Sequence, residues 1–243
     1  MTPQPTPLSI SAEHGVSSKG YMRILLFILL TIPAVSFAVE SICFGTTSKG
    51  SLENGVKLPA SGNNFTNYSR AAILAGRTFV HSEVRDIIVG AYKALESTYP
   101  DKVFKYAETG KRKGGIFKPH KTHQNGLSVD FMTPMKTKAN KSVHLPTNVF
   151  NRLGYDIELD SKGEYKGLSI DYEALAAHIV ELHKQAKASG HDLWRVILDP
   201  NLQPPLFETA HGQYLRENIQ FTKKRSWVRH DEHYHIDFAV ACE

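Results

Sequence analysis

The sequence lacks the features that would place it in several large classes of protein. Its 243 residues contain no internal repeat, no low-complexity tract and no linker that would separate two domains. The basic residues, in a chain of formal net charge +5, are not interleaved with aromatic residues, and no second acidic cluster offers a two-metal site. A nucleic-acid partner or a nuclease activity is therefore not expected. With 41% hydrophobic and 22% charged residues, the chain can bury the core of one globular domain.

A long hydrophobic run is also absent. The apolar run at residues 24–33 is too short to span a bilayer comfortably, and it ends at Pro33. It follows Arg23 and precedes the small residues Ser36 and Ala38, which is the pattern of a secretory signal peptide cleaved after Ala38. A retained membrane anchor is the alternative interpretation of this segment.

The boundaries of the mature protein follow from this interpretation. Residues 22–38 form the expected signal peptide, and Met22 would be its natural first residue. Residues 1–21 are then a non-native or untranslated extension. Residues 39–243 form the expected single domain, which would be exported to the periplasm and would keep no stable membrane anchor after cleavage.

Cysteine is scarce, with one residue near each end of the mature chain, Cys43 and Cys242. In an oxidising compartment the two could form a disulfide that closes a very long loop and contributes about 3–5 kcal/mol. Two free thiols are the alternative. No cysteine lies at the expected cleavage point, so the sequence does not predict a lipid anchor there.

Hydrophobic periodicity predicts two amphipathic helices. The first begins at the expected N-cap Ser82 and ends before Pro100. The second begins near Asp171 and ends at Gly190, a residue typical of helix C-termini. Each helix carries apolar residues along one face, so each is expected to cover a sheet or to pack against the other.

Short strands are expected between and after these helices. Residues 45–69, which are rich in Gly, Ser, Asn and Thr, are expected to be irregular. Alternating or apolar runs predict strands at 103–107, 127–131, 193–198 and 234–238. Together the elements predict an α+β fold, with a small, mostly antiparallel sheet flanked by helices and joined by long loops.

The first group of candidate site residues is a loop histidine, His123, followed seven positions later by Asp130. If Leu127 and Phe131 face the core, Asp130 projects from the other face of its strand. Gly126 permits the turn that can bring His123 back over the carboxylate. Alone, this pair is a weak signal.

The second group lies in the terminal strand, where His233 and His235 share one face about 6 to 7 Å apart. Two histidines and one carboxylate leave a fourth coordination position open, as in a catalytic zinc site, and this predicts such a site on the sheet. A zinc ion there would acidify its water and polarise a carbonyl, and the second histidine could act as base or charge stabiliser. A polar strand face without metal is the alternative.

These residues also resemble the motifs of a known family, the penicillin-insensitive murein endopeptidases. They are zinc D,D-endopeptidases within a wider group that includes lysostaphin-type peptidases, D-Ala-D-Ala peptidases and hedgehog domains. The spaced histidines near the C-terminus are the specific part, and the likeness extends through most of the mature chain. The similar positions are His123, Gly126, Asp130, His230, His233, His235 and the segments 50–55, 114–117 and 195–200.

The resemblance implies which residues bind metal. His123, Asp130 and His235 would bind the catalytic zinc ion, and His120 matches a further histidine of the family that can serve an auxiliary metal. The other ligands for a second ion have no clear match in residues 150–166. One catalytic zinc ion is therefore expected, and a second is doubtful.

The resemblance also implies catalytic residues. His233 would be the catalytic histidine beside the metal, and His230 a further active-site residue. Glu232 lies three residues before His235, which is the spacing of the base and a zinc ligand in the D-Ala-D-Ala peptidases. Strand alternation alone would point Glu232 away from this face unless a bulge returned it, so Glu232 is the second candidate for the base. A solvated loop end is the alternative.

The expected function is that of a secreted, periplasmic zinc metallopeptidase that cleaves peptide cross-links of peptidoglycan at the D-alanyl to diaminopimelate bond. A D,D-carboxypeptidase or D-Ala-D-Ala dipeptidase is the alternative enzyme, favoured by the Glu232 spacing. A secreted binding module with a structural zinc, or with none, is the alternative without catalysis. The expected partners are peptidoglycan muropeptides, and the sequence leaves the oligomeric state open.

Overall fold

The computed structural model describes residues 39–226 and 228–243, so the expected extension 1–21 and signal peptide 22–38 lie outside the described residues. Its largest sheet has five strands, all antiparallel to their neighbours except the last two, which are parallel. In spatial order these are β12 (Asp192–Ile197), β13 (His233–Ala239), β7 (Ser128–Met132), β6 (Phe104–Tyr106) and β4 (Phe65–Asn67).

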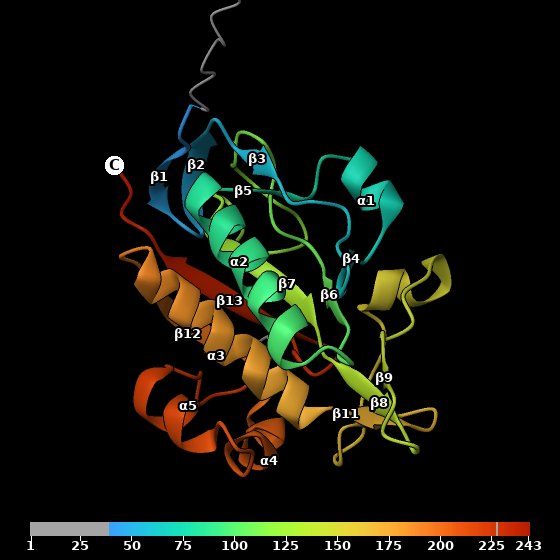
Figure 1. Ribbon diagram of the computed structural model, residues 1–243. Helices are drawn as coiled ribbons and strands as arrows, with labels where there is room; N and C mark the ends of the chain where they lie inside the picture. Colours follow the sequence, from blue (N-terminus) through green and yellow to red (C-terminus); the bar gives the residue numbers. More distant parts are fainter. Residues whose placement is uncertain (1–38, 227) are drawn as a thin grey trace, which may run out of the picture. The chain divides into compact units, whose positions relative to one another are not determined.

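The remaining elements are short strands and helices around this sheet (Figure 1). A four-stranded sheet contains β10 (Glu164–Tyr165), β11 (Leu168–Ile170), β8 (Met135–Thr137) and β9 (Ser142–Val143). Two strand pairs are β1 (Ile42–Thr46) with β2 (Lys49–Glu53), and β3 (Val56–Lys57) with β5 (Phe79–Val80). The helices are α1 (Arg70–Leu74), α2 (Ser82–Thr98), α3 (Tyr172–Ala188), α4 (Gln203–Phe207) and α5 (Gly212–Asn218), with 3₁₀ turns η1 (Val149–Gly154) and η2 (Pro200–Leu202). The predicted α+β fold is confirmed.

Helices α2 and α3 pack side by side against one face of the five-stranded sheet (Figure 1). They are the two amphipathic helices that the sequence predicts. The apolar stripe of α2 is buried at every expected position, and these positions are Val84, Ile87, Ile88, Ala91 and Leu95. The burial of such a stripe is the main source of stability for a helix of this length.

The start of α2 differs from the expectation by one residue. His81 is the N-cap, and its Nδ1 atom accepts a hydrogen bond from the backbone N–H of Glu83 at 3.2 Å. The hydroxyl of Ser82, the expected cap, instead accepts a hydrogen bond from the N–H of Ser41 at 3.1 Å. The Ser82 side chain therefore contacts Ser41, 41 positions away in the chain, and does not cap the helix as the local sequence predicts.

The expectation that residues 45–69 are irregular is wrong. Strand β2 forms a hairpin with β1, and β4 joins the central sheet beside β6. Composition favoured a loop because Gly, Ser, Asn and Thr dominate the segment, but pairing with partners outside the window overrides that local preference.

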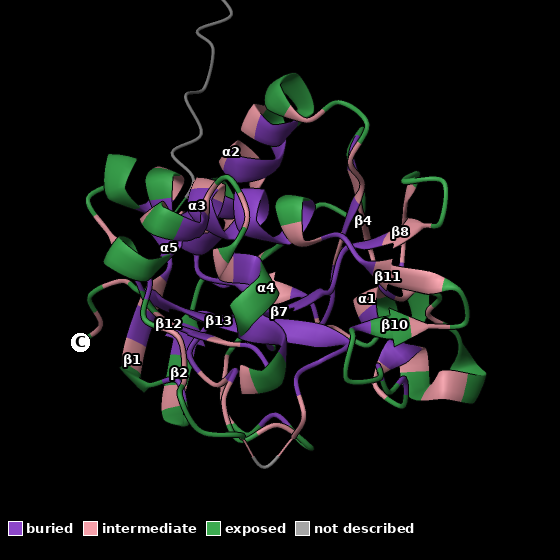
Figure 2. Ribbon diagram, turned by 90° about the horizontal axis from the view of Figure 1, so that it is seen from below, coloured by how far each residue is buried: buried purple, intermediate pink, exposed green. Residues whose placement is uncertain are grey.

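The central strands β7 and β13 are buried along nearly their whole length (Figure 2). Their register places Tyr234 opposite Phe131 and His235 opposite Asp130. Because side chains alternate between the faces of a sheet, the first pair faces the helices and the second faces away from them. The Phe131 ring contacts His178 of α3 edge-on, with ring centroids 4.9 Å apart.

A disulfide joins Cys43 of β1 to Cys242, which realises the first of the two alternatives for these cysteines. Beside it, the N–H of Glu243 donates to the carbonyl of Cys43 at 2.9 Å. The bond links residues 199 positions apart and so constrains the unfolded chain strongly. No helix within residues 39–226 and 228–243 combines the length and hydrophobicity of a membrane span.

Candidate metal centre

The carboxylate of Asp130 lies at the centre of the candidate site, on the face of β7 that points away from the helices. It is fully buried. Directly opposite on β13, the Nδ1 atom of His235 lies 2.8 Å from Asp130 Oδ1. Burial by itself opposes the charged carboxylate, but the surrounding histidines, His123 and His233 foremost, hold the pKa of Asp130 well below its usual value. The group is therefore an anion inside a low-dielectric site, where it attracts cations strongly.

His123 approaches the same carboxylate from the loop before β7. Its Nε2 atom lies 3.3 Å from Asp130 Oδ1, while its Nδ1–H donates to the carbonyl of Thr109 at 2.9 Å. That bond fixes the tautomer and leaves Nε2 with a free lone pair. This buried Nε2 makes no hydrogen bond to any described residue. A buried nitrogen with a free lone pair, without a hydrogen-bond partner and beside a carboxylate, is suited to bind a metal ion.

The backbone around His123 explains how a loop residue reaches this position. Gly126 has φ +79°, and a Cβ there would lie 2.8 Å from the backbone N of His81. That N–H donates to the Gly126 carbonyl at 3.0 Å, so the loop is held against the start of α2. The glycine is required both by its conformation and by this close approach.

His235 is held from both sides. Its Nε2 atom lies 2.9 Å from Asp237 Oδ1, and Asp237 also accepts hydrogen bonds from Ser128 and Arg195. Burial lowers the pKa of His235, but Asp237 and Asp130 more than offset it and raise that pKa to about 10. Without metal both ring nitrogens therefore carry protons. A metal at Nδ1 would displace one of them, while Asp237 would continue to orient the ring.

His120 completes a group of donors around Asp130. The ligand atoms of His120, His123 and Asp130 all lie within 4.8 Å of one another, so these residues could hold a metal ion. His120 Nε2 contacts Glu108 at 2.6 Å, and its Nδ1 lies 3.6 Å from Asp130 Oδ2. The ring of His123 lies between those of His120 and His235, with centroids 4.8 and 4.9 Å away. Nitrogen and carboxylate donors in this number suit zinc.

The strand β13 begins at His233, which lies on the same face as His235. His233 Nε2 is 3.9 Å from Asp130 Oδ2, and its Nδ1 is 2.6 Å from Glu232 Oε1. Glu232 needs no bulge to make this contact, because it precedes the strand and alternation does not constrain it. Its carboxylate contacts Nδ1 of His233, whereas Nε2 is the ring nitrogen nearer Asp130.

His230 lies beside His233, with ring centroids 4.7 Å apart. Its Nδ1–H donates to the carbonyl of Val228 at 2.9 Å. Burial, together with the nearby His233, lowers the pKa of His230 to about 3, so this ring is neutral near pH 7. Its Nε2 atom is left as a hydrogen-bond acceptor.

Tyr155 is a site residue that the sequence analysis missed. Its hydroxyl donates to Asp130 Oδ2 at 3.0 Å and accepts from the N–H of Glu108 at 3.3 Å. Its ring packs edge-on against that of His233, with centroids 4.9 Å apart. No local pattern marks this tyrosine, which follows the 3₁₀ turn η1. Asp237 was also missed, although its alternation with His233 and His235 was a usable signal.

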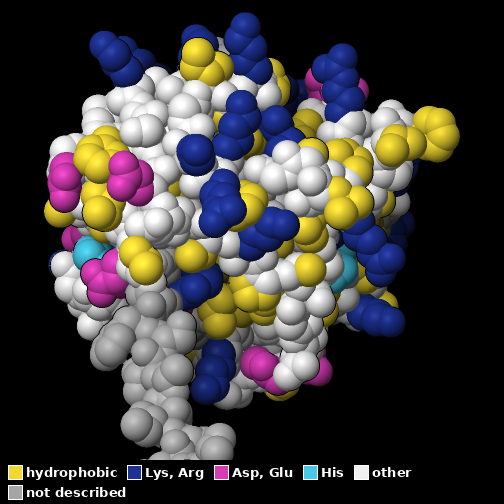
Figure 3. Space-filling view, turned by 90° about the horizontal axis from the view of Figure 1, so that it is seen from above, with side chains coloured by type: hydrophobic (Ala, Val, Ile, Leu, Met, Phe, Trp, Pro, Cys, Tyr) yellow, Lys and Arg dark blue, Asp and Glu magenta, His cyan; other side chains and the backbone are white. Residues whose placement is uncertain are grey.

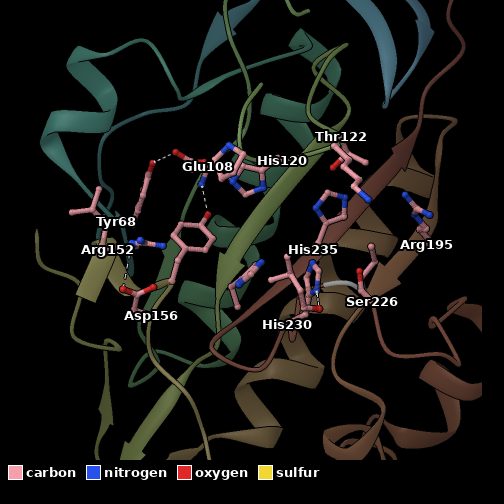
Figure 4. A pocket seen from close by; sticks show the side chains of 17 residues that line it. Tyr68, Glu108, His120, Thr122, Arg152, Asp156, Arg195, Ser226, His230 and His235 are labelled. Carbon is pink, nitrogen blue, oxygen red and sulfur yellow. Dashed lines mark hydrogen bonds and ion pairs between the residues drawn. The ribbon is translucent and has the colours of Figure 1, made fainter. Parts of the chain in front are cut away.

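A cavity of about 620 Å³ opens onto this group of side chains (Figure 4). Figure 4 draws His120 and Glu108 on one side of the cavity and Arg195, from β12, on the other, with His230 and His235 between them. His123 and Asp130 do not line the cavity and lie behind the residues that do. A substrate of several residues can therefore reach the outer histidines while the inner donors stay buried.

The surface carries an excess of basic side chains. Lys and Arg gather on the face that Figure 3 shows. The loop residues 111–113, Lys-Arg-Lys, are exposed. Such a surface attracts polyanions of any kind and does not by itself select one.

An α+β fold with buried His and Asp donors behind an open cavity defines a candidate metal-dependent enzyme. Comparison with known families sharpens this class, because residues 43–243 match the family described as penicillin-insensitive murein endopeptidase. The chain belongs to this family, which confirms the resemblance inferred from its motifs. It is therefore assigned to the peptidases that act on peptidoglycan. No curated protein matches the chain.

Proposed function

We propose that this protein is a zinc D,D-endopeptidase that is exported to the periplasm and cleaves the D-alanyl to diaminopimelate cross-links of peptidoglycan. One observation carries the proposal. His123 Nε2 and His235 Nδ1 both lie against the Asp130 carboxylate, because Thr109 and Asp237 hold their other nitrogens. Outer partners of this kind are typical of metal-binding histidines. Family membership supports peptidoglycan as the substrate.

His123, Asp130 and His235 are the proposed zinc ligands, and His120 is a further donor on the cavity side. A bound zinc ion would supply an acidified water and polarise the amide carbonyl. One ion is proposed. The carboxylate nearest His120, that of Glu108, already accepts hydrogen bonds from Arg77 and Tyr68, so it is not offered for a second ion.

His233 is the proposed base and proton carrier. Glu232 holds its Nδ1 atom, so Nε2 is directed toward Asp130, and the residue lines the cavity. In this position His233 can take a proton from the attacking water and deliver it to the leaving amine. Glu232 is then a positioning residue rather than the base. His230 lines the cavity with its Nε2 as an acceptor for a substrate N–H.

Digestion of purified sacculi by the zinc-loaded protein, followed by mass spectrometry, tests the proposal because the masses of the products identify the bond that is cleaved. The endopeptidase converts cross-linked muropeptide dimers into monomers and leaves the lengths of the peptide stems unchanged. A carboxypeptidase or dipeptidase would instead trim monomeric stems. Stoichiometric zinc with no cleavage of any muropeptide would indicate a binding module and would contradict the proposal.

Export is the second part of the proposal. Residues 22–38 are proposed as the signal peptide, and a cell-wall substrate fits a periplasmic protein. Mass spectrometry of the exported protein should find Val39 as the first residue, and that of the precursor should begin at Met22. A precursor that retains residues 1–21 would contradict the proposed start, and an exported chain that retains residues 24–33 would indicate a membrane anchor.

A further inference from the structure

The wall of the cavity next to His235 contains one arginine with most of its hydrogen-bonding capacity unused. Arg195 lies on β12, directly opposite Asp237 of β13, and lines the cavity. Its Nε–H donates to Asp237 Oδ2 at 2.6 Å. Its guanidinium lies over the ring of Trp194, 4.4 Å from the centroid. The side chain is 30% exposed, so this group is ordered by its neighbours and still open to the cavity.

A guanidinium has five N–H donors, and only Nε–H of Arg195 is used within residues 39–226 and 228–243. The two terminal nitrogens retain four N–H groups. They form the planar fork that binds a carboxylate through two parallel hydrogen bonds. Contact with Trp194 and Asp237 fixes the plane of this fork before any ligand binds, which reduces the entropy lost on binding.

The charge of Arg195 is only partly neutralised by its own partner. Asp237 is fully buried and also contacts His235 and Ser128, so its charge is shared by three donors. The other arginine of the cavity, Arg152, differs because it is 81% exposed and has an acid of its own, Asp156, at 3.4 Å. Of the two arginines, Arg195 is thus the better placed for an anionic group of a ligand.

Arg195 is also close to the proposed chemistry. Asp237 binds Arg195 through one oxygen and His235 through the other, at 2.6 and 2.9 Å. A ligand group held by Arg195 therefore lies beside the proposed zinc site, on the β12 side of the cavity (Figure 4). Only a group near the scissile amide could occupy this position while the amide carbonyl lies at the metal centre.

We propose that Arg195 binds a free carboxylate on the residue that supplies the nitrogen of the scissile amide. This inference rests on the proposed function. In a D-alanyl to diaminopimelate cross-link, the carbon that carries the amide nitrogen also carries a carboxyl group. In a peptide stem that ends in D-Ala-D-Ala, the carbon that carries the nitrogen of the last amide also carries the C-terminal carboxylate. Arg195 therefore favours substrates in which this carboxyl group is free over substrates in which it is amidated.

The test uses the zinc-loaded protein and two cross-linked dimers that differ only at this carboxyl group, one free and one amidated. Wild type should cleave the free acid about 10- to 100-fold more efficiently, the range expected for a charge-assisted, bidentate contact. Arg195→Gln should lose the preference, chiefly through a higher KM for the acid, and keep its zinc. Arg195→Lys should keep part of it, because the charge remains without the fork. Arg85→Gln, at an arginine of α2 that pairs with Asp86 and does not line the cavity, is the matched control and should behave as wild type.

Two results would overturn the inference. Equal cleavage of both dimers by wild type would show that the carboxylate is not recognised. A uniform loss of kcat in Arg195→Gln, with the preference intact, would show that Arg195 only supports Asp237. A pentapeptide monomer serves as a further substrate, and Arg195-dependent trimming of its terminal D-Ala would identify a chain terminus as the source of the carboxylate.

A binding measurement distinguishes failure of this inference from failure of the proposed function. The zinc-loaded His233→Ala protein should bind the free-acid dimer about 10- to 100-fold more tightly than the amidated dimer, and a second change, Arg195→Gln, should equalise them. If wild type cleaves no cross-link but this preference is found, the proposed activity fails and the carboxylate site stands. If cross-links are cleaved but binding shows no preference, the proposed function stands and only the carboxylate site is contradicted.

Discussion

The two faces of strand β13 are equally buried and chemically opposite. Residues that point toward the helices are apolar or aromatic, and residues that point away are ionisable. The first set is Tyr234, Ile236 and Phe238, and the second is His233, His235 and Asp237, all at most 2% exposed. A buried polar group is costly unless it is paired, and each member of the second set has a carboxylate, hydroxyl or cationic partner. The comparison shows a strand that stabilises the fold with one face and builds the site with the other.

Substitutions on the polar face should give the largest effects, on activity rather than folding. Asp130→Ala and His235→Ala should each abolish zinc binding and cleavage, because each removes a proposed ligand. His233→Ala should lower kcat about 10²- to 10⁴-fold, the range for a lost general base, and keep one zinc per chain. Metal analysis and muropeptide digestion of the three proteins measure both quantities. Full activity in either ligand variant would contradict the assigned site.

Substitution on the apolar face should affect stability instead. Phe238→Ala should lower the free energy of unfolding by about 3–5 kcal/mol, since it leaves a cavity at a fully buried ring. The folded fraction should still bind zinc, because the polar face is unchanged. Urea unfolding and metal analysis test this, with Phe150→Ala, at a phenylalanine that is 96% exposed, as the matched control. Loss of zinc from folded Phe238→Ala protein would show that the faces are not independent.

Asp237 tests the outer support of the polar face. Asp237→Asn keeps the size of the side chain but removes the charge that orients His235, so zinc affinity should fall about 10- to 100-fold. Competition with a chelator of known affinity measures this change. Asp86→Asn, at an exposed acid of α2 that pairs with Arg85, provides the control. Unchanged affinity in Asp237→Asn would show that the His235 ring is oriented without this carboxylate.

The smallest predicted effect concerns pH and the helix side of the sheet. Burial among Tyr92, Phe104 and Phe131 lowers the pKa of His178 to about 3. In the unfolded chain, a histidine is protonated below about pH 6.5. The contribution of His178 to the free energy of unfolding is therefore complete above about pH 6.5. It falls by about 1.4 kcal/mol per pH unit as the pH decreases toward 3.

Urea unfolding of the zinc-free protein at pH 6.5 and 5.5 measures this loss. His178→Phe should lose about 1 kcal/mol less than wild type over that interval, since it has no group to protonate. Equal losses in the two proteins would show that His178 is not held neutral in the folded state.

Much of this comparison could be predicted from the sequence because alternation is local. The period of two in residues 234–238 assigns Tyr234, Ile236 and Phe238 to one face without reference to any partner strand. The helix periodicity of Val84 to Leu95 is equally local and is borne out in α2. The fold class followed from these patterns, whereas the strands within residues 45–69 depend on distant partners and were missed.

The parts of the site that depend on register and loops could not be predicted in this way. The pairing of His235 with Asp130 depends on how β13 aligns with β7, which no local pattern specifies. Tyr155 reaches Asp130 from a loop without periodicity. Glu232 was expected to point away by alternation, but the rule does not apply to a residue that precedes the strand. Its contact with His233 depends on where β13 begins, which alternation alone does not specify.

The most direct measurement is anomalous diffraction at the zinc absorption edge from crystals of the zinc-loaded protein. The account predicts one strong peak within bonding distance of His123 Nε2, an Asp130 oxygen and His235 Nδ1, about 2.0–2.2 Å from each. His233 Nε2 should face this peak without bonding it. A peak at another group of residues, or no peak in a protein that cleaves cross-links, would contradict the account.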